Sequence, residues 1–152
     1  MPANKKPRKA YRPRGLIYDP VAYIKQGFAP LTSMTSANVD LRIKYHNAMA
    51  QIQTGKGDMH DIDTLIAASN MAMGLKKLGM GGDWEQELDD AANAIIALRG
   101  RYRETGRAVC RAGELKAINL LLAIHDAQLD ASTIGELEQA IKIVKRKEAI
   151  AV

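Results

Sequence analysis

The single cysteine of this chain, Cys110, is the residue type best suited to nucleophilic catalysis. Arg107 and Arg111 flank it, and neighbouring cations can lower the pKa of a thiol. A nucleophilic cysteine also needs a base within hydrogen-bond reach, and that base must be oriented by a third group. The sequence around Cys110 supplies no such base and matches no cysteine-enzyme motif. This pattern favours an inert or partly buried thiol over a reactive one.

Metal binding would require clustered ligands, but His46, His60 and His125 each stand alone in their segments. The densest group of possible ligands is the run DMHDID at 58–63. This run lacks the glycine and the terminal glutamate of a calcium-binding loop. Carboxylates are also favoured at the N-terminus of a helix, where the helix dipole is positive. We therefore predict that Asp58 caps a helix and that the run holds no metal.

His125 and Asp126 are adjacent in the sequence, which invites comparison with a catalytic base and the acid that orients it. Successive residues of a helix point in different directions, so Asp126 cannot easily orient the imidazole ring. We expect His125 to line a groove or to be semi-buried. Because no convergent set of acid and base is visible, we predict a protein that is not an enzyme, with no catalytic residues and no cofactor.

Two glycine-rich segments, TGKGD at 54–58 and GMGGD at 79–83, invite comparison with phosphate-binding loops. Neither has the spacing of a P-loop or follows a strand, so we predict two ordinary loops between helices. The second leads into five acidic residues within 83–90, which would repel a phosphate. This acidic stretch is either a solvated first helical turn or a docking surface for a cationic partner, including the basic arm of another copy.

The strongest positive signal is the N-terminal segment MPANKKPRKAYRPRG, residues 1–15. Residues 1–14 contain six basic residues and no acid, so they carry a formal charge of +6, while the net charge of the whole chain is +5. Three prolines and charge repulsion predict a disordered or extended arm. Such cations can follow a phosphate backbone, and a tyrosine among them can stack on an exposed base. The predicted nucleic-acid-binding residues are Lys5, Lys6, Arg8, Lys9, Tyr11, Arg12 and Arg14. The alternative is a solubilising tail or a run resembling a nuclear-import signal.

Residues 16–152 are expected to form one helical domain. The chain is 47% hydrophobic but only 5% aromatic, and its abundant alanine, leucine and methionine favour helices over strands. Apolar residues recur at spacings of three and four, which predicts an all-α bundle of about five or six helices. The expected helices cover 19–28, 36–54, 58–78, 83–105, 113–131 and 133–147. The third has the widest apolar surface, so we expect it at the centre.

Helix boundaries follow from capping residues and glycines. Caps are expected at Asp19, Ser36 and Asp58, capping boxes at Asp83–Gln86 and Thr133–Glu136, and stops at Gly55 and Gly106. The most regular helical spacing of apolar residues comprises Trp84, Leu88, Ala91, Ile95, Leu98 and Tyr102, and within it Ile95 and Leu98 are expected to be buried.

Cysteine usage and hydropathy bear on the compartment. One cysteine cannot form an intramolecular disulfide, and a lone thiol fits a reducing cytosol. No apolar run approaches the roughly 18 residues of a membrane span, and no apolar segment typical of a signal peptide follows the basic start. These features predict a cytoplasmic protein without a membrane contact.

The opening MPANKKPRKAYRPRG, the segment NMAMGLKKLGMGGDW and the segment IHDAQLD together resemble small uncharacterised accessory proteins of proteobacterial temperate phages and integrative elements. The resemblance covers most of the chain and brings no catalytic residues with it. It implies an accessory gene of a mobile element expressed in a bacterial cytoplasm, where a nuclear-import signal has no use. Two roles are then expected: handling the element's nucleic acid, or blocking a component of host defence.

The leading expectation is a non-enzymatic nucleic-acid-binding accessory protein that contacts DNA or RNA through the arm, with Lys142, Lys145, Arg146 and Lys147 as further cations. A helix-turn-helix candidate spans 113–147, but the last helix begins with Ile134, Gly135, Glu136 and Leu137, so weak sequence specificity is expected. The alternative is a protein-binding inhibitor or adaptor, such as a phage anti-defence protein, that acts through its helical surface as a homo-oligomer. Seven methionines favour an adaptable surface of this kind, although methionines also fill cores.

Overall fold

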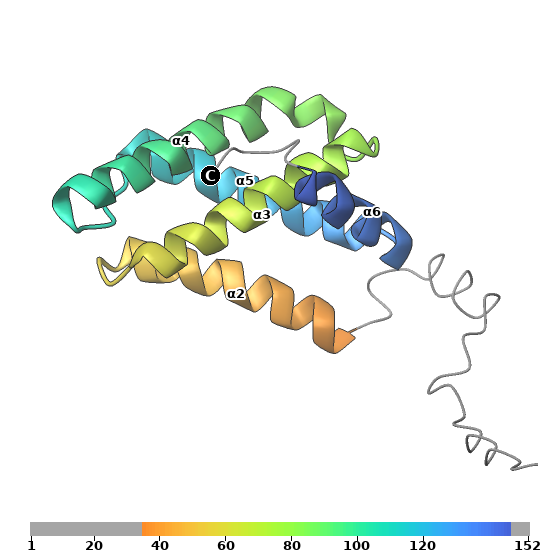
Figure 1. Ribbon diagram of the computed structural model, residues 1–152, viewed down its shortest axis with the longest axis horizontal. Helices are drawn as coiled ribbons and strands as arrows, with labels where there is room; N and C mark the ends of the chain where they lie inside the picture. The colour runs from red at the N-terminus through yellow and green to blue at the C-terminus, as the bar shows by residue number, and fades with distance from the viewer. Residues whose placement is uncertain (1–34, 147–152) are drawn as a thin grey trace, which may run out of the picture.

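The computed structural model describes residues 35–146 of the chain. The elements are α2 (Thr35–Gln53), α3 (Met59–Lys77), a 3-10 turn η2 (Gly82–Trp84), α4 (Glu85–Thr105), α5 (Ala112–Ala131) and α6 (Ile134–Lys145) (Figure 1). Five α-helices and no strand lie within these residues, which confirms the all-α bundle. The predicted arm at 1–15, the expected helix at 19–28 and Lys147 lie outside the described residues.

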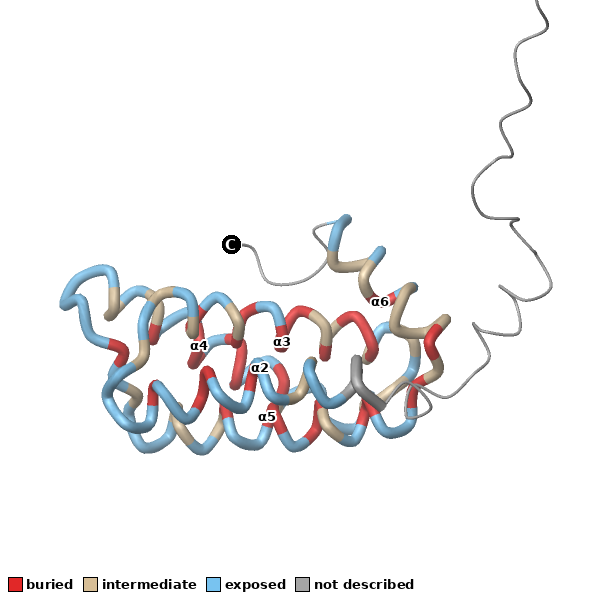
Figure 2. The backbone as a smooth tube through the Cα atoms, turned by 90° about the horizontal axis from the view of Figure 1, so that it is seen from below, coloured by how far each residue is buried: buried red, intermediate tan, exposed pale blue. Residues whose placement is uncertain are grey.

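Helix α3 is the centre of the bundle, as its wide apolar surface predicted. It packs against α2, α4, α5 and α6, and its buried positions cover most of its circumference, with Asp63 and Ala67 exposed on the remaining side. Figures 1 and 2 show α2, α3, α4 and α5 along the long dimension, with α6 lying across α3 near one end. None of the helices in residues 35–146 is long and apolar enough to cross a bilayer.

Small residues allow α6 to approach α3 closely. A Cβ added to Gly74 would lie 3.0 Å from the carbonyl oxygen of Ala140, and Ala140 itself is fully buried. Any larger side chain at Gly74 would therefore push the two helices apart. The glycine in the middle of α3 thus has a packing role that outweighs its cost in helix propensity.

Capping residues set three of the helix ends as expected. Asp58 accepts a hydrogen bond from the Asp61 backbone at 3.0 Å, and the Asp61 carboxylate accepts one from the Asp58 backbone at 3.0 Å. The Thr133 hydroxyl accepts a hydrogen bond from the Glu136 backbone amide. The Glu136 carboxylate accepts one from the Thr133 hydroxyl, rather than from the Thr133 backbone amide as a full capping box requires. Gly106 ends α4 with a φ of 70°.

Two expected helix starts are wrong. The predicted box of Asp83 and Gln86 does not form, because η2 occupies 82–84 and α4 begins two residues later than expected. The Gln86 amide instead donates to Asp90, one turn further along α4. Helix α2 begins at Thr35, so Ser36 is its second residue rather than its cap.

The apolar face of α4 is buried as predicted, with one exception. Leu88, Ala91, Ile95 and Leu98 are 0% exposed, and Tyr102 is partly buried against the core. Trp84, the first residue of the expected helical spacing, is 45% exposed and does not continue this buried face. The reason is that Trp84 belongs to the 3-10 turn, so the helical period of α4 does not extend to it.

Ile95 and Ile96 provide a direct test of this face, because they are adjacent but 0% and 48% exposed. We expect Ile95→Ala to lower the free energy of unfolding by about 2–4 kcal/mol, since it removes buried methyl groups and leaves a cavity. Ile96→Ala should change it by less than about 0.5 kcal/mol. Urea unfolding of both variants measures the difference, and equal losses would contradict the assigned core.

Candidate functional site

The predicted nucleic-acid-binding residues of the arm, from Lys5 to Arg14, lie outside the described residues. Residues 35–146 contain two other groups of exposed cations. Lys142, Lys145 and Arg146 are exposed at the C-terminal end of α6. Their role as further phosphate contacts, expected from the sequence, remains a prediction.

A second group of cations lies where the α2–α3 loop meets the α4–α5 loop. The two loops are neighbours, because a hollow of about 180 Å³ is lined by Gln53 and Gly55 from one and by 108–110 from the other. We call this region the basic end; its exposed cations are Lys56, Arg103, Arg107 and Arg111. No ion pair joins Lys56, Arg103 or Arg107 to another residue within 35–146. The sequence carried the signal, five arginines within 99–111, but our prediction did not use it as a site.

A salt bridge holds the α4–α5 loop in place. Arg101 donates to both carboxylate oxygens of Glu114, at 3.0 and 2.8 Å, and also to the backbone carbonyl of Val109. The Glu114 carboxylate also accepts from the Arg111 backbone at 3.0 Å. The hydrogen bonds from Arg101 lower the pKa of Glu114, which keeps it charged. One acidic group thus orders the loop, and of the outer arginines only Arg111 lies close enough to interact with its charge.

Cys110 lies in this loop and is partly buried, one of the two states that the sequence favoured. Burial raises the pKa of its thiol, and the Glu114 carboxylate raises it further. Arg101 is the cation that acts against this shift, rather than Arg107 and Arg111 as the sequence suggested. The shift is away from the thiolate, which is the nucleophilic form.

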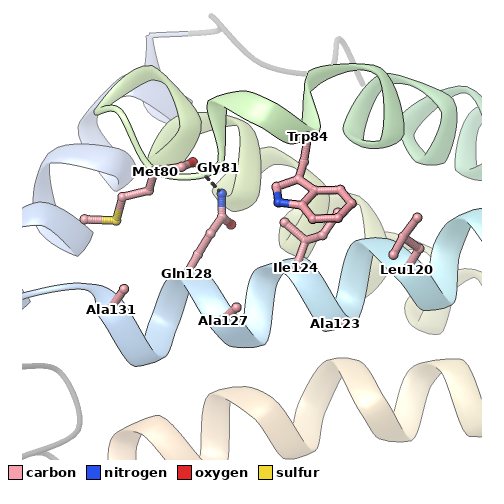
Figure 3. Close-up of a pocket in the computed structure, with 9 residues that line it drawn as sticks. All are labelled: Met80, Gly81, Trp84, Leu120, Ala123, Ile124, Ala127, Gln128 and Ala131. Carbon is pink, nitrogen blue, oxygen red and sulfur yellow. Dashed lines mark hydrogen bonds between the residues drawn. The ribbon is translucent and has the colours of Figure 1, made fainter.

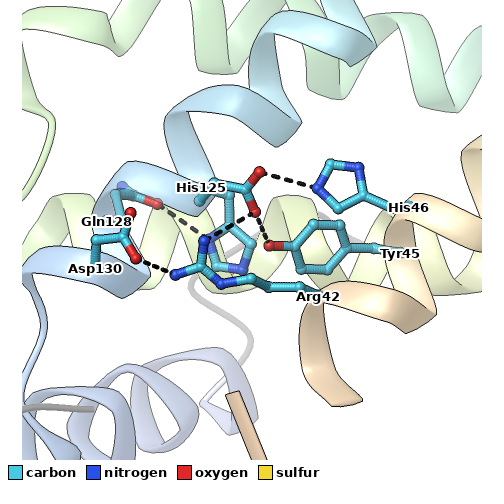
Figure 4. A network of polar contacts seen from close by, with 7 residues as sticks. Arg42, Tyr45, His46, His125, Gln128 and Asp130 are labelled. Atoms are coloured by element: carbon cyan, nitrogen blue, oxygen red, sulfur yellow. Dashed lines mark hydrogen bonds and ion pairs between the residues drawn. The ribbon is translucent and has the colours of Figure 1, made fainter. Parts of the chain in front are cut away.

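A polar cluster joins α2 to α5 (Figure 4). The Tyr45 hydroxyl donates to Asp126, and His46 Nε2 lies 2.9 Å from the other oxygen of Asp126. Arg42 pairs with Asp130 and lies 3.8 Å from Asp126. Asp126 is therefore engaged by α2 and does not orient His125, as its place on the helix predicted.

His125 lines a hollow of about 230 Å³ between α2, α3 and α5, one of the two positions expected, and at 1% exposure it is more deeply buried than the semi-buried alternative. Its Nδ1–H donates to the Gln128 side-chain oxygen at 3.2 Å, and its ring lies 5.3 Å from that of Tyr45. Burial lowers the pKa of His125 to about 4, so the ring is neutral at pH 7. A neutral ring shielded from solvent supports packing between α5 and α2 rather than proton transfer with a substrate.

The run at 58–63 acts as a helix start, as predicted. Asp58 and Asp61 are engaged with each other's backbone amides, as described above. Within residues 35–146 no group of three or more histidine, cysteine or acidic residues is placed to hold a metal ion.

An apolar hollow of about 480 Å³ lies between η2 and the outer side of α5 (Figure 3). We call it the Trp84 groove, and its principal lining residues are Met80, Trp84, Leu120, Ile124, Ala127 and Ala131. The Gln128 amide forms part of its wall and donates to the carbonyls of Ala72 and Met80, both at 3.0 Å. The acidic stretch starts at this groove, because Asp83 precedes Trp84 and Glu85 follows it.

Helix α4 separates the acidic stretch from the basic end. It begins at Glu85 and ends at Thr105, and 21 helical residues span about 30 Å.

Comparisons with protein-family models, with curated proteins and with solved structures found no match to this chain.

The buried histidine predicts a specific pH dependence of stability. The unfolded chain binds the His125 proton with a pKa of about 6.5, whereas the pKa in the folded state is about 4. Because the unfolded state binds the proton more readily, the free energy of unfolding should decrease as the pH falls below about 6.5. The expected loss between about pH 7 and about pH 5 is about 2 kcal/mol.

Urea unfolding at the two pH values measures this loss. A His125→Leu variant should lose most of the difference between the two pH values, whatever its absolute stability. His60→Gln removes an exposed histidine and should keep the difference. An unchanged pH dependence in His125→Leu would show that another group is responsible.

Proposed function

We propose that this chain is a non-enzymatic nucleic-acid-binding accessory protein that grips phosphates through its basic arm and its basic end. The observation that carries the proposal is the basic end, where Lys56, Arg103 and Arg107 are exposed and have no ion pair within the described residues. Arginine and lysine side chains of this kind supply most of the affinity of a protein for DNA or RNA. The arm would add up to six further phosphate contacts.

Weak sequence specificity is part of this proposal. In a helix-turn-helix, the first residues of the second helix contact the base edges. Here Ile134 is buried, Glu136 and Leu137 are partly buried, and α6 packs on α3. Such a helix start is poorly suited to enter the major groove. Contacts to phosphates alone carry no sequence information.

The resemblance noted in the sequence supports a setting for this activity. A mobile element in a bacterial cytoplasm has its own nucleic acid to package, protect or transfer. A small protein with many phosphate contacts and little base readout suits such a task.

Salt dependence of binding tests the proposal. For duplex DNA, the log of the affinity should fall against the log of the salt concentration with a slope of roughly −5 from the arm alone. Deleting residues 1–14 should reduce the slope by this amount and weaken duplex and single strands together. Arg103→Gln combined with Arg107→Gln should reduce the slope by about 2. Tyr11→Ala should weaken single-strand binding more than duplex binding, because stacking needs an unpaired base.

Lys44→Gln is the matched control for these charge changes, because Lys44 is exposed on α2 and belongs to neither basic region. It should lower the slope by no more than about 1. Fluorescence polarisation with labelled duplex and single strands measures every variant. If the slope of log affinity against log salt concentration is the same in the intact chain and in the arm deletion, the arm does not bind the phosphates.

A protein-binding inhibitor or adaptor is the second candidate, and the Trp84 groove is the observation that favours it. Exposed apolar hollows on a small protein are common binding surfaces. Pull-down of the tagged full chain, with and without nuclease, separates the two functions. Recovered nucleic acid supports the first function, whereas a stoichiometric protein that survives nuclease supports the second.

A further inference from the structure

The Trp84 groove is apolar but has no covering element within residues 35–146. Its rims remain accessible, since Trp84 is 45% exposed and Leu120 is 38% exposed. Its floor is made by small side chains of α5 such as Ala127 and Ala131, which leave room for an additional helix (Figure 3). Trp84 is the only tryptophan of the chain, and with Leu120 and Ile124 it gives the hollow a continuous apolar lining, the kind of surface that marks a binding site.

We propose that residues 16–28 of this same chain form a short amphipathic helix that docks in the Trp84 groove. The segment LIYDPVAYIKQGF has a helix start at Asp19–Pro20. From there Val21, Ile24 and Phe28 follow at spacings of three and four, which places them on one face. Phe28 is the only phenylalanine of the chain, and large apolar groups of this kind favour a buried site.

The dimensions of the groove fit this segment. A helix from Pro20 to Phe28 is about 13 Å long, and the stretch of α5 from Leu120 to Ala131 is about 16 Å long. The tether is long enough as well. Residues 29–34 connect the segment to Thr35, and six extended residues span up to about 20 Å.

The tether also begins at the correct end of the bundle. Helix α2 runs antiparallel to α5, because its residue Arg42 pairs with Asp130 while Gln53 lies against Asn119. The start of α2 is therefore near the C-terminal end of α5, where Ala131 closes the groove. Residues 29–34 need to pass only from this end onto the adjacent face of α5.

Charge complementarity supports the same occupant. Asp83 stands beside Trp84, and Asp89 and Asp90 are exposed on the next turns of α4, whereas Glu85 already pairs with Lys76 at 2.6 Å. The proposed helix carries Lys25, and the arm with six cations directly precedes it. Docking would bring these cations towards the acidic stretch, which lies about 30 Å along α4 from the basic end.

Trp84 itself reports on the groove, because it is the only tryptophan of the chain. The experiment compares the full chain with the double variant Val21→Asp and Ile24→Asp by tryptophan emission and acrylamide quenching. The matched control is Gln26→Asp, which adds a charge to the same segment away from the apolar face. Circular dichroism of each variant checks that the bundle is intact.

In the intact chain and in Gln26→Asp, emission should be blue-shifted and quenching weak. In the double variant, emission should shift to the red and the quenching constant should rise severalfold. Losing two buried aliphatic side chains should weaken docking by roughly two orders of magnitude or more. A synthetic peptide of residues 16–28, added to the double variant, should restore the blue-shifted emission in a saturable way.

Two results would overturn the proposal. If Trp84 is equally exposed in the intact chain and in the double variant, the segment does not cover the groove. If the blue shift depends on protein concentration and the sedimentation mass doubles with it, the occupant is a second copy. Neither result depends on whether the protein binds nucleic acid, so the proposal stands or falls separately from that function.

Discussion

The side-chain amide of Gln128 joins three parts of the bundle at one buried point. Its nitrogen donates to a carbonyl of α3 and to a carbonyl of the α3–α4 loop, and its oxygen accepts from His125 on its own helix. The bonds to His125 and to Ala72 are buried and the bond to Met80 is partly buried, so leaving these groups unpaired would be costly. The position of the loop follows from this arrangement. With the loop held against α5, Trp84 is placed over α5 and the acidic stretch begins beside it.

Charge is distributed along the bundle although the chain beyond residue 14 is almost neutral. The cations of the α4–α5 loop and the acids at the start of α4 are at opposite ends of one helix. The basic end suits phosphates, and the acidic stretch suits a cationic segment. The basic end and the Trp84 groove thus lie towards different ends of the same molecule.

Several titratable groups stabilise the fold, including His125 and Asp126, which the sequence suggested as a possible base and its orienting acid. Asp126 binds the side chains of α2, His125 is neutral within the core, and Glu114 orders a loop. Each of these groups hydrogen-bonds to protein groups, and His125 in addition lines a hollow between α2, α3 and α5.

The sequence by itself determined the helices and most of their buried faces, because those depend on local spacing. The period of Leu88, Ala91, Ile95 and Leu98, the cap at Asp58 and the stop at Gly106 are all local features, and the structure agrees with them. The N-terminal boundary of α4 was not predictable, since Asp83 and Gln86 satisfy a capping pattern whether or not a 3-10 turn intervenes. That choice depends on the loop contact with Gln128, which is 48 residues away from Met80 in sequence.

Only the tertiary structure decided where the surface features meet. The sequence showed arginines at 99–111 and a lysine at 56, but their meeting at one end depends on the packing of two loops. The exposure of Trp84 and the hollow beside it depend on how far η2 stands from α5. Spacing along a chain specifies which face of a helix is apolar, whereas the distance between two helices depends on the side chains of both. For that reason the sequence could predict the bundle, and only the folded chain could show the groove and the basic end.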